Sequence, residues 1–202
     1  MSRLPLTLAF SLRSTLRRGL ASPCIAAALL ALLALPASAQ RSHDPLNPQE
    51  VDQLRDSAQE PDVRLKLLVG FNRARLAALE QMRADPKTTD RGSKTRDMLQ
   101  EFLDVFDELS DNVDMYADRK DDMRKGLKLV IEADTEFAAR LRAIKDSAAT
   151  TKEEVEAYRF LLDNAIETID ASANDHRKLL VEQEELAKRR KQAHPKKDDD
   201  RR

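Results

Sequence analysis

The apolar residues between positions 99 and 144 follow one alternating spacing of three and four residues. This spacing constrains the fold of the chain more than any other feature, because it puts the apolar side chains along one side of an α-helix. Only Lys120 and Asp134 interrupt it. The residues that follow the spacing are Leu99, Phe102, Phe106, Leu109, Val113, Tyr116, Met123, Leu127, Val130, Phe137, Leu141 and Ile144.

The unbroken phase favours one long helix over residues 93–147, bent near residues 117–122. Such a helix would be about 80 Å long at 1.5 Å per residue. The alternative is a break between Asp118 and Asp122, which would give two helices and a compact four-helix bundle. Both alternatives remain open from the sequence.

Helix signals also flank this segment on both sides. Residues 47–50 (Asn-Pro-Gln-Glu) form an N-capping box, and a second apolar segment runs from Pro61 to about Met82. The loop of residues 85–92 follows it. Thr150 or Thr151 caps a last helix that extends to about Arg190 with its own heptad pattern. With four glycines and no run of β-branched residues, the chain is predicted to be all-α, an antiparallel bundle of three or four long helices with coiled-coil-like packing.

Helix pairing can be counted outward from the connections. The 85–92 loop predicts that Leu79 lies near Leu99 and Phe71 near Phe106. The short connection at 148–150 predicts that Ile144 lies near Val155 and Phe137 near Leu162.

The first 39 residues have the features of a signal peptide. A leader with four arginines and no acidic residue precedes an apolar run of about 12 residues, too short to span a bilayer. Ala37 and Ala39 fit a signal-peptidase site, so cleavage is expected after Ala39 and no stable membrane insertion after it. Export through the Sec route predicts a periplasmic or secreted protein.

The predicted mature chain divides into three parts. Residues 40–46 are expected to be a disordered leader, 47–190 the helical bundle domain, and 191–202 a disordered charged tail. Because four of the 35 Lys and Arg leave with the signal peptide, the formal net charge changes from −1 to −5. A net negative charge gives the protein no overall electrostatic attraction to nucleic acid, so no nucleic-acid partner is expected. A basic run, residues 188–191, could touch an anionic surface, but acidic residues 198–200 follow it.

Acidic residues gather between positions 104 and 122. On the heptad register all of them point outward, which is typical of a solvated face, although like charges at this spacing destabilise a helix slightly. A carboxylate stripe could meet a basic partner or bind Ca²⁺ or Mg²⁺ weakly, with Asp107, Asp111 and Asp114 as the weak metal candidates. The interaction candidates are Asp104, Asp107, Glu108, Asp111, Asp114 and Asp118, and Asp121 and Asp122 complete the stripe.

Residues that could perform catalysis are few. His176 and Asp134 occupy seam positions, where a structural imidazole and a polar layer are expected, and Arg159, Asn164 or Lys128 could pair with Asp134. The chain has no nucleophile motif, no glycine-rich phosphate loop and no metal-ligand pattern with a second histidine. The sequence therefore predicts no enzyme and no cofactor.

These observations predict an exported, non-catalytic helical protein of the bacterial cell envelope. It would act by contact, as an interaction, scaffold or chaperone-like module whose partner is an unknown envelope protein. The alternative is a weak divalent-cation-binding periplasmic protein that uses residues 104–122. A homo-oligomer would also fit so long an apolar seam, although one chain could use both of its seams internally.

Overall fold

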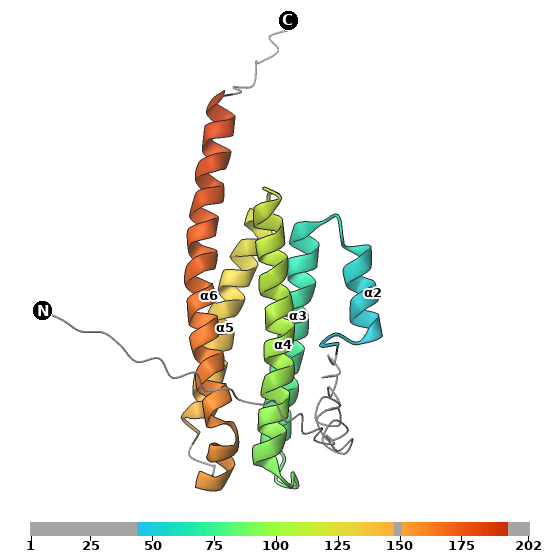
Figure 1. Ribbon diagram of the computed structural model, residues 1–202, viewed down its shortest axis with the longest axis vertical. Helices are drawn as coiled ribbons and strands as arrows, with labels where there is room; N and C mark the ends of the chain where they lie inside the picture. The colour runs from blue at the N-terminus through green and yellow to red at the C-terminus, as the bar shows by residue number, and fades with distance from the viewer. Residues whose placement is uncertain (1–43, 148–150, 194–202) are drawn as a thin grey trace, which may run out of the picture. The chain divides into compact units, whose positions relative to one another are not determined.

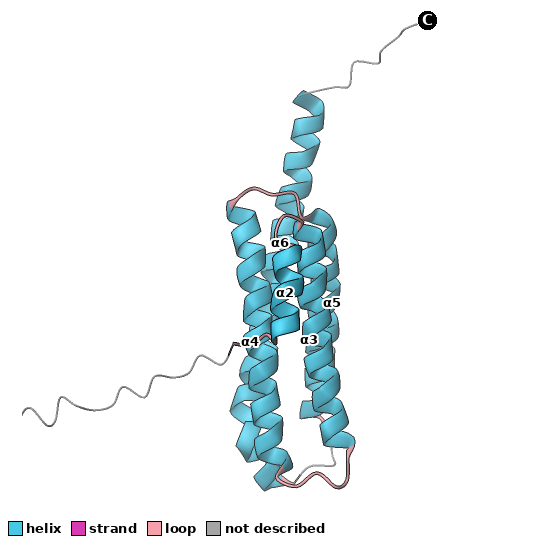
Figure 2. Cartoon of the chain, turned by 90° about the vertical axis from the view of Figure 1, so that its right-hand side faces the viewer, coloured by secondary structure: helices cyan, strands magenta, loops and turns pink. Residues whose placement is uncertain are grey.

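The computed structural model describes residues 44–147 and 151–193; the predicted signal peptide, residues 40–43 and residues 194–202 lie outside them. The regular secondary structure of these two ranges is helical throughout (Figures 1 and 2), which confirms the all-α prediction. No described helix is both long enough and apolar enough to cross a membrane. The helices are α2 (Pro48–Asp56), α3 (Pro61–Ala84), α4 (Arg91–Asp118), α5 (Arg124–Lys145) and α6 (Lys152–Ala193).

Four helices form a ring in which α3 packs on α4, α4 on α6, α6 on α5, and α5 on α3, while α2 packs on α3. The pair α3 and α4 is antiparallel, as Figure 1 shows. Arg64 bonds to Asn112 at one end of the pair, and Arg83 bonds to Thr95 at the other. The register predicted from the 85–92 loop is confirmed by these two contacts.

Helices α3 and α5 run parallel. The carboxylate of Asp62 accepts a 2.7 Å hydrogen bond from the backbone N–H of Gly126, and Glu80 binds Arg140 about five turns further along α3 and about four turns further along α5. Because α4 and α5 stand at opposite corners of the ring, the connection of residues 119–123 crosses one end of the bundle. The bundle is therefore not a simple up-and-down meander.

The break between α4 and α5 is a left-handed helix cap. Lys120 has a φ of 59°, its N–H donates to the carbonyl of Ala117 at 2.9 Å, and the N–H of Asp121 donates to that of Tyr116 at 3.0 Å. These two bonds define a Schellman motif, which satisfies carbonyls at the helix end. The prediction of a single helix over 93–147 is wrong, and the alternative of a break between Asp118 and Asp122 is correct. The described residues form five helices, one more than the three or four that were expected.

The two halves of the predicted seam meet across the centre of the ring. The ring of Phe137 on α5 lies edge-on to that of Phe102 on α4, with centroids 5.5 Å apart, and 6.4 Å from that of Phe106. All three side chains are fully buried. The common apolar phase therefore reflects one shared core and not one continuous helix.

Two glycines allow neighbouring helices to approach closely. A Cβ added to Gly92 would lie 3.1 Å from the Cβ of Ala157 and from backbone atoms of Glu154 on α6. A Cβ added to Gly126 would lie 3.0 Å from Leu65 and 3.1 Å from the backbone of Asp62. These contacts fix the spacing of the two parallel pairs, α4 with α6 and α3 with α5.

Helix α2 is anchored at its start. The side chains of Asn47 and Glu50 form the predicted capping box. Glu50 also binds Arg75 of α3, with the closest contact at 2.6 Å, and Arg75 donates to the carbonyl of Pro45. Leu46 is buried. Residues 44–46 of the predicted leader thus lie against the bundle.

The register of α5 and α6 differs from the one counted from their connection. Asp134 meets His176, about three helical turns further along α6 than predicted. The first turns of α6 pack instead at the α3–α4 end of the bundle. There the guanidinium of Arg83 lies 5.2 Å from the ring centroid of Tyr158. The turn therefore does not set the pairing, because α6 extends past the end of α5 before it packs against it.

Candidate functional site

The acidic face of α4, residues 104–118, points away from the core. Phe102, Phe106, Leu109, Val113 and Tyr116 are fully buried on the opposite side of the helix. The carboxylates between them in the sequence are therefore turned outward: Asp107, Asp111, Asp114 and Asp118 are exposed, whereas Asp104 and Glu108 are half-buried.

None of the six carboxylates on this face forms an ion pair within residues 44–147 and 151–193; Asp104 accepts a hydrogen bond from Gln100. Other acids of the bundle do find basic partners. On α5 and α6, for example, Asp163 binds Lys145, and Glu184 binds Lys128. The face of α4 is thus a concentration of uncompensated negative charge.

The charges on this face repel one another. Partial burial raises the pKa of Asp107 above 3.8, and the neighbouring carboxylates of Asp104 and Asp111 raise it further. Burial raises the pKa of Glu108 above 4.5, and Asp111 adds to the effect. The ionised face is therefore less favourable in the folded chain than in an unfolded one.

Asp121 and Asp122, beyond the end of α4, behave differently. Both oxygens of Asp122 bind Arg124, at 2.7 and 2.6 Å, and this hydrogen bonding lowers the pKa of Asp122. Asp121 lies 3.1 Å from Arg119. The sequence groups these two residues with the stripe, but the structure separates them from its uncompensated part.

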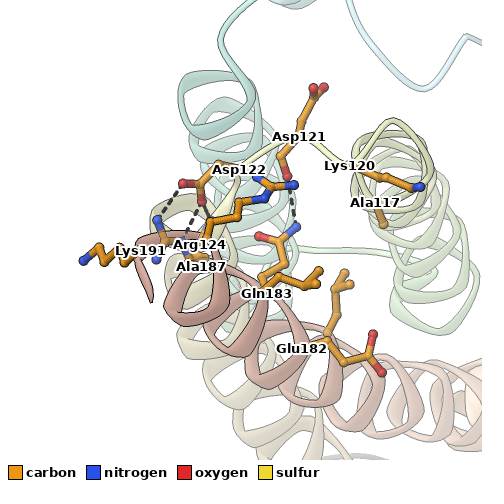
Figure 3. A pocket seen from close by; sticks show the side chains of 12 residues that line it. Ala117, Lys120, Asp121, Asp122, Arg124, Glu182, Gln183, Ala187 and Lys191 are labelled. Atoms are coloured by element: carbon orange, nitrogen blue, oxygen red, sulfur yellow. Dashed lines mark hydrogen bonds and ion pairs between the residues drawn. The ribbon is translucent and has the colours of Figure 1, made fainter. Parts of the chain in front are cut away.

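A half-open cleft of about 660 Å³ lies between the α4–α5 connection and α6 (Figure 3). Gln183 of α6 closes its base, because its amide donates to the carbonyl of Asp121 and accepts from the N–H of Met123. Apolar and charged groups both line the cleft: Ala117, Leu179, Leu186 and Ala187 with Lys120, Asp121, Asp122, Arg124, Glu182, Arg190 and Lys191.

Helix α6 continues past the ends of the other helices as a single helix (Figure 1). Within the described residues, its last hydrogen bonds and ion pairs to other helices or their connections are those of Gln183 and of Glu184 with Lys128. Leu186 is 50% exposed, although it continues the heptad seam. Sequence reasoning missed this surface. The available signal was an α6 heptad pattern that extends further than the partner helix can cover.

Asp134 and His176 form a pair inside the bundle. Oδ2 of Asp134 lies 2.8 Å from Nδ1 of His176, with the two side chains 0% and 7% exposed. The partners proposed from the sequence, Arg159, Asn164 and Lys128, are wrong, because the partner of Asp134 is His176. Lys128 binds Glu184 instead, and Arg159 binds Glu156. The predicted polar layer is present, and His176 is the residue that completes it.

Within the described ranges, no group of three or more His, Cys, Asp or Glu side chains is arranged to hold a metal ion. Asp107, Asp111 and Asp114 follow one another along a single exposed helix face. Tyr158, the other buried side chain of α6 with a titratable group, lies near the start of that helix, far from His176. Asp134, His176 and Tyr158 therefore do not form one site.

Comparison with known protein families, curated proteins and solved structures finds no significant match. The functional argument therefore rests on the geometry of this chain.

Proposed function

We propose that this chain is an exported, non-catalytic contact module of the bacterial cell envelope, and that the acidic face of α4 binds a basic surface of a partner protein. The observation that carries the proposal is that the six carboxylates of this face have no ion-pair partner within the described residues. Scaffolding and chaperone-like holding are two forms that such contact takes.

The electrostatics of the face support attraction to a cation-bearing partner. Repulsion from Asp104 and Asp111 contributes to the raised pKa of Asp107. Lysine or arginine side chains brought near the face would relieve that repulsion, so binding would gain from both attraction and relief. Because most of these carboxylates are exposed to solvent, the contact should weaken as the salt concentration rises.

The burial of the reactive groups favours contact over catalysis. Asp134 and His176 are enclosed in the core, and neither lines the cleft beside α6. The charged groups that a partner protein could contact are the exposed ones, such as the carboxylates on the acidic face of α4.

Crosslinking in intact envelopes followed by purification tests the proposal. Reversing Asp107, Asp111 and Asp114 to Lys should abolish recovery of the partner. Recovery from the unaltered protein should also fall as NaCl is raised.

The matched control reverses three exposed acids on other faces, Glu132, Glu153 and Glu167. It changes the net charge by the same amount, so it should leave recovery intact. Equal loss in both triple variants, or no loss in either, would refute the acidic face as the contact surface.

A further inference from the structure

We propose that the C-terminal part of α6, residues 179–193, is a self-association surface on which two copies of this chain pair antiparallel, with Leu186 near the two-fold axis. This surface is separate from the acidic face of α4 and does not depend on the function proposed above. Three observations carry it: an uncovered apolar seam, a self-complementary charge pattern, and a cleft beside the seam.

The seam of α6 continues past the point where the bundle can cover it. His176 is buried at a seam position, Leu179 and Gln183 are half-buried, and Leu186 is 50% exposed. Exposure thus increases along one face as α6 leaves the other helices behind. A second helix packed on this face would bury Leu186 in the same way that the bundle buries the earlier seam residues of α6, such as His176.

The charges along this segment are arranged in two blocks. Glu182, Glu184 and Glu185 precede Leu186, and the basic run of residues 188–191 follows Ala187. In an antiparallel pair centred near Leu186, the acidic block of each copy lies opposite the basic block of the other. A parallel pair would set like charges side by side, so the pattern selects the antiparallel arrangement.

Contacts within one copy leave part of both blocks available. Lys188 binds Glu185, and Glu184 binds Lys128. Glu182 and Arg189, by contrast, have no ion-pair partner within the described residues. Both residues flank the seam on the same side, where opposing charges of an antiparallel pair meet.

The cleft gives the end of the second helix a place to lie. It opens along α6 from Leu179 to Lys191 and is bounded on the other side by Ala117 and Lys120 of the α4 end. When Leu186 of one copy lies over that of the other, the last turn of the second copy's α6 is brought beside Leu179, which lines the cleft. Because the pair has two-fold symmetry, the last turn of the first copy's α6 lies beside Leu179 of the second copy in the same way.

The contact is small, because the projecting part of α6 is only the segment from Glu184 to Ala193. An interface below the standard size gives a weak association. We therefore expect a concentration-dependent dimer that loses affinity as salt is raised.

Analytical ultracentrifugation of the purified protein tests the proposal over roughly 10 to 500 µM, the range in which a weak dimer forms. The unaltered protein should shift from monomer to dimer, and Leu186→Asp should remain monomeric. The matched control is Val181→Asp: Val181 is 61% exposed but lies on the opposite face of α6. It should dimerise as the unaltered protein does.

A charge exchange supplies the second arm. A variant with residues 188–191 changed to Glu and one with Glu182 and Glu185 changed to Lys should each be monomeric alone and form a heterodimer when mixed. All these positions are exposed, so the fold should be retained, which circular dichroism checks. A protein that stays monomeric throughout the range overturns the proposal. So does a dimer that Leu186→Asp leaves intact, or a mixture that does not restore pairing.

Discussion

The carboxylate of Asp134 lies 2.8 Å from Nδ1 of His176 and joins α5 to α6 inside the bundle. Oδ2 of Asp134 and Nδ1 of His176 share this hydrogen bond. The second oxygen of Asp134 is buried and has no hydrogen-bond partner among the described residues. Removing either side chain would leave the other buried and unpaired. The stability lost when both are removed should therefore be smaller than the sum of the two single losses.

We expect Asp134→Leu and His176→Leu each to lower the free energy of unfolding by about 3 kcal/mol, because each leaves a buried polar group unpaired. The double variant should lose less than the sum, with a coupling free energy of about 1 kcal/mol or more. Urea denaturation of the four proteins measures this. Strictly additive losses would show that the pair is not energetically coupled.

The close helix approaches at Gly92 and Gly126 predict that Gly→Ala destabilises the fold at these two positions. The same change at Gly70 should have the opposite effect. At Gly92 and Gly126 the new Cβ meets α6 and α3 at 3.0–3.1 Å, so each change should destabilise the fold by about 1 to 3 kcal/mol. At Gly70 nothing lies within 4 Å, so alanine should stabilise the helix by about 1 kcal/mol. Thermal melts compare them, and a stabilising Gly92→Ala would contradict the α4–α6 contact.

The left-handed cap at Lys120 predicts that glycine is better there. A side chain at a φ of 59° is strained by roughly 1 kcal/mol, and Lys120→Gly removes that strain. The control is Lys66→Gly, at an exposed position inside α3, which should destabilise by about 1 kcal/mol. If α4 and α5 were one helix, both changes would destabilise the protein, and denaturation midpoints distinguish the two cases.

The raised pKa of Asp107 sets a pH dependence. Since its pKa in the folded chain lies above the ordinary value of 3.8, ionisation disfavours the folded state, fully so above the folded pKa. Asp107→Asn should therefore stabilise the protein at neutral pH by a few tenths of a kcal/mol, and this gain should vanish as the pH falls below about 3.8.

Glu80 supplies the control of opposite sign, because its hydrogen bond to Arg140 lowers its pKa below 4.5. Its contribution to stability is present above the unfolded pKa and is lost as the pH falls through the folded pKa. Glu80→Gln should thus destabilise at neutral pH and converge on the unaltered protein in acid. Melting curves from about pH 3 to pH 7 should show the two differences with opposite signs.

Local signals in the sequence predicted the helices well. The capping box at Asn47, the loop before α4 and the outward direction of the acidic face all follow from spacing within a few residues. The α3–α4 register also followed, because the loop is short and both helices begin packing at once. Such features depend on residues that lie close together in the sequence, so they can be predicted without the structure.

Long-range features were less predictable. The phase shared by Tyr116 and Met123 conceals a break, because residues from two helices can fill one core without a change of spacing. The pairing of Asp134 with His176 depends on how far α6 runs past α5, which the connection does not encode. The cleft depends on both of these features, so no local pattern pointed to it.

Site-specific photocrosslinking in intact cells tests the central claim most directly. A photoreactive residue placed at Asp111 should trap a partner protein with a basic surface, whereas the same residue at the exposed control position Glu167 should not. Equal crosslinking from both positions, or none from Asp111, would contradict the assignment of the acidic face of α4 as the contact surface.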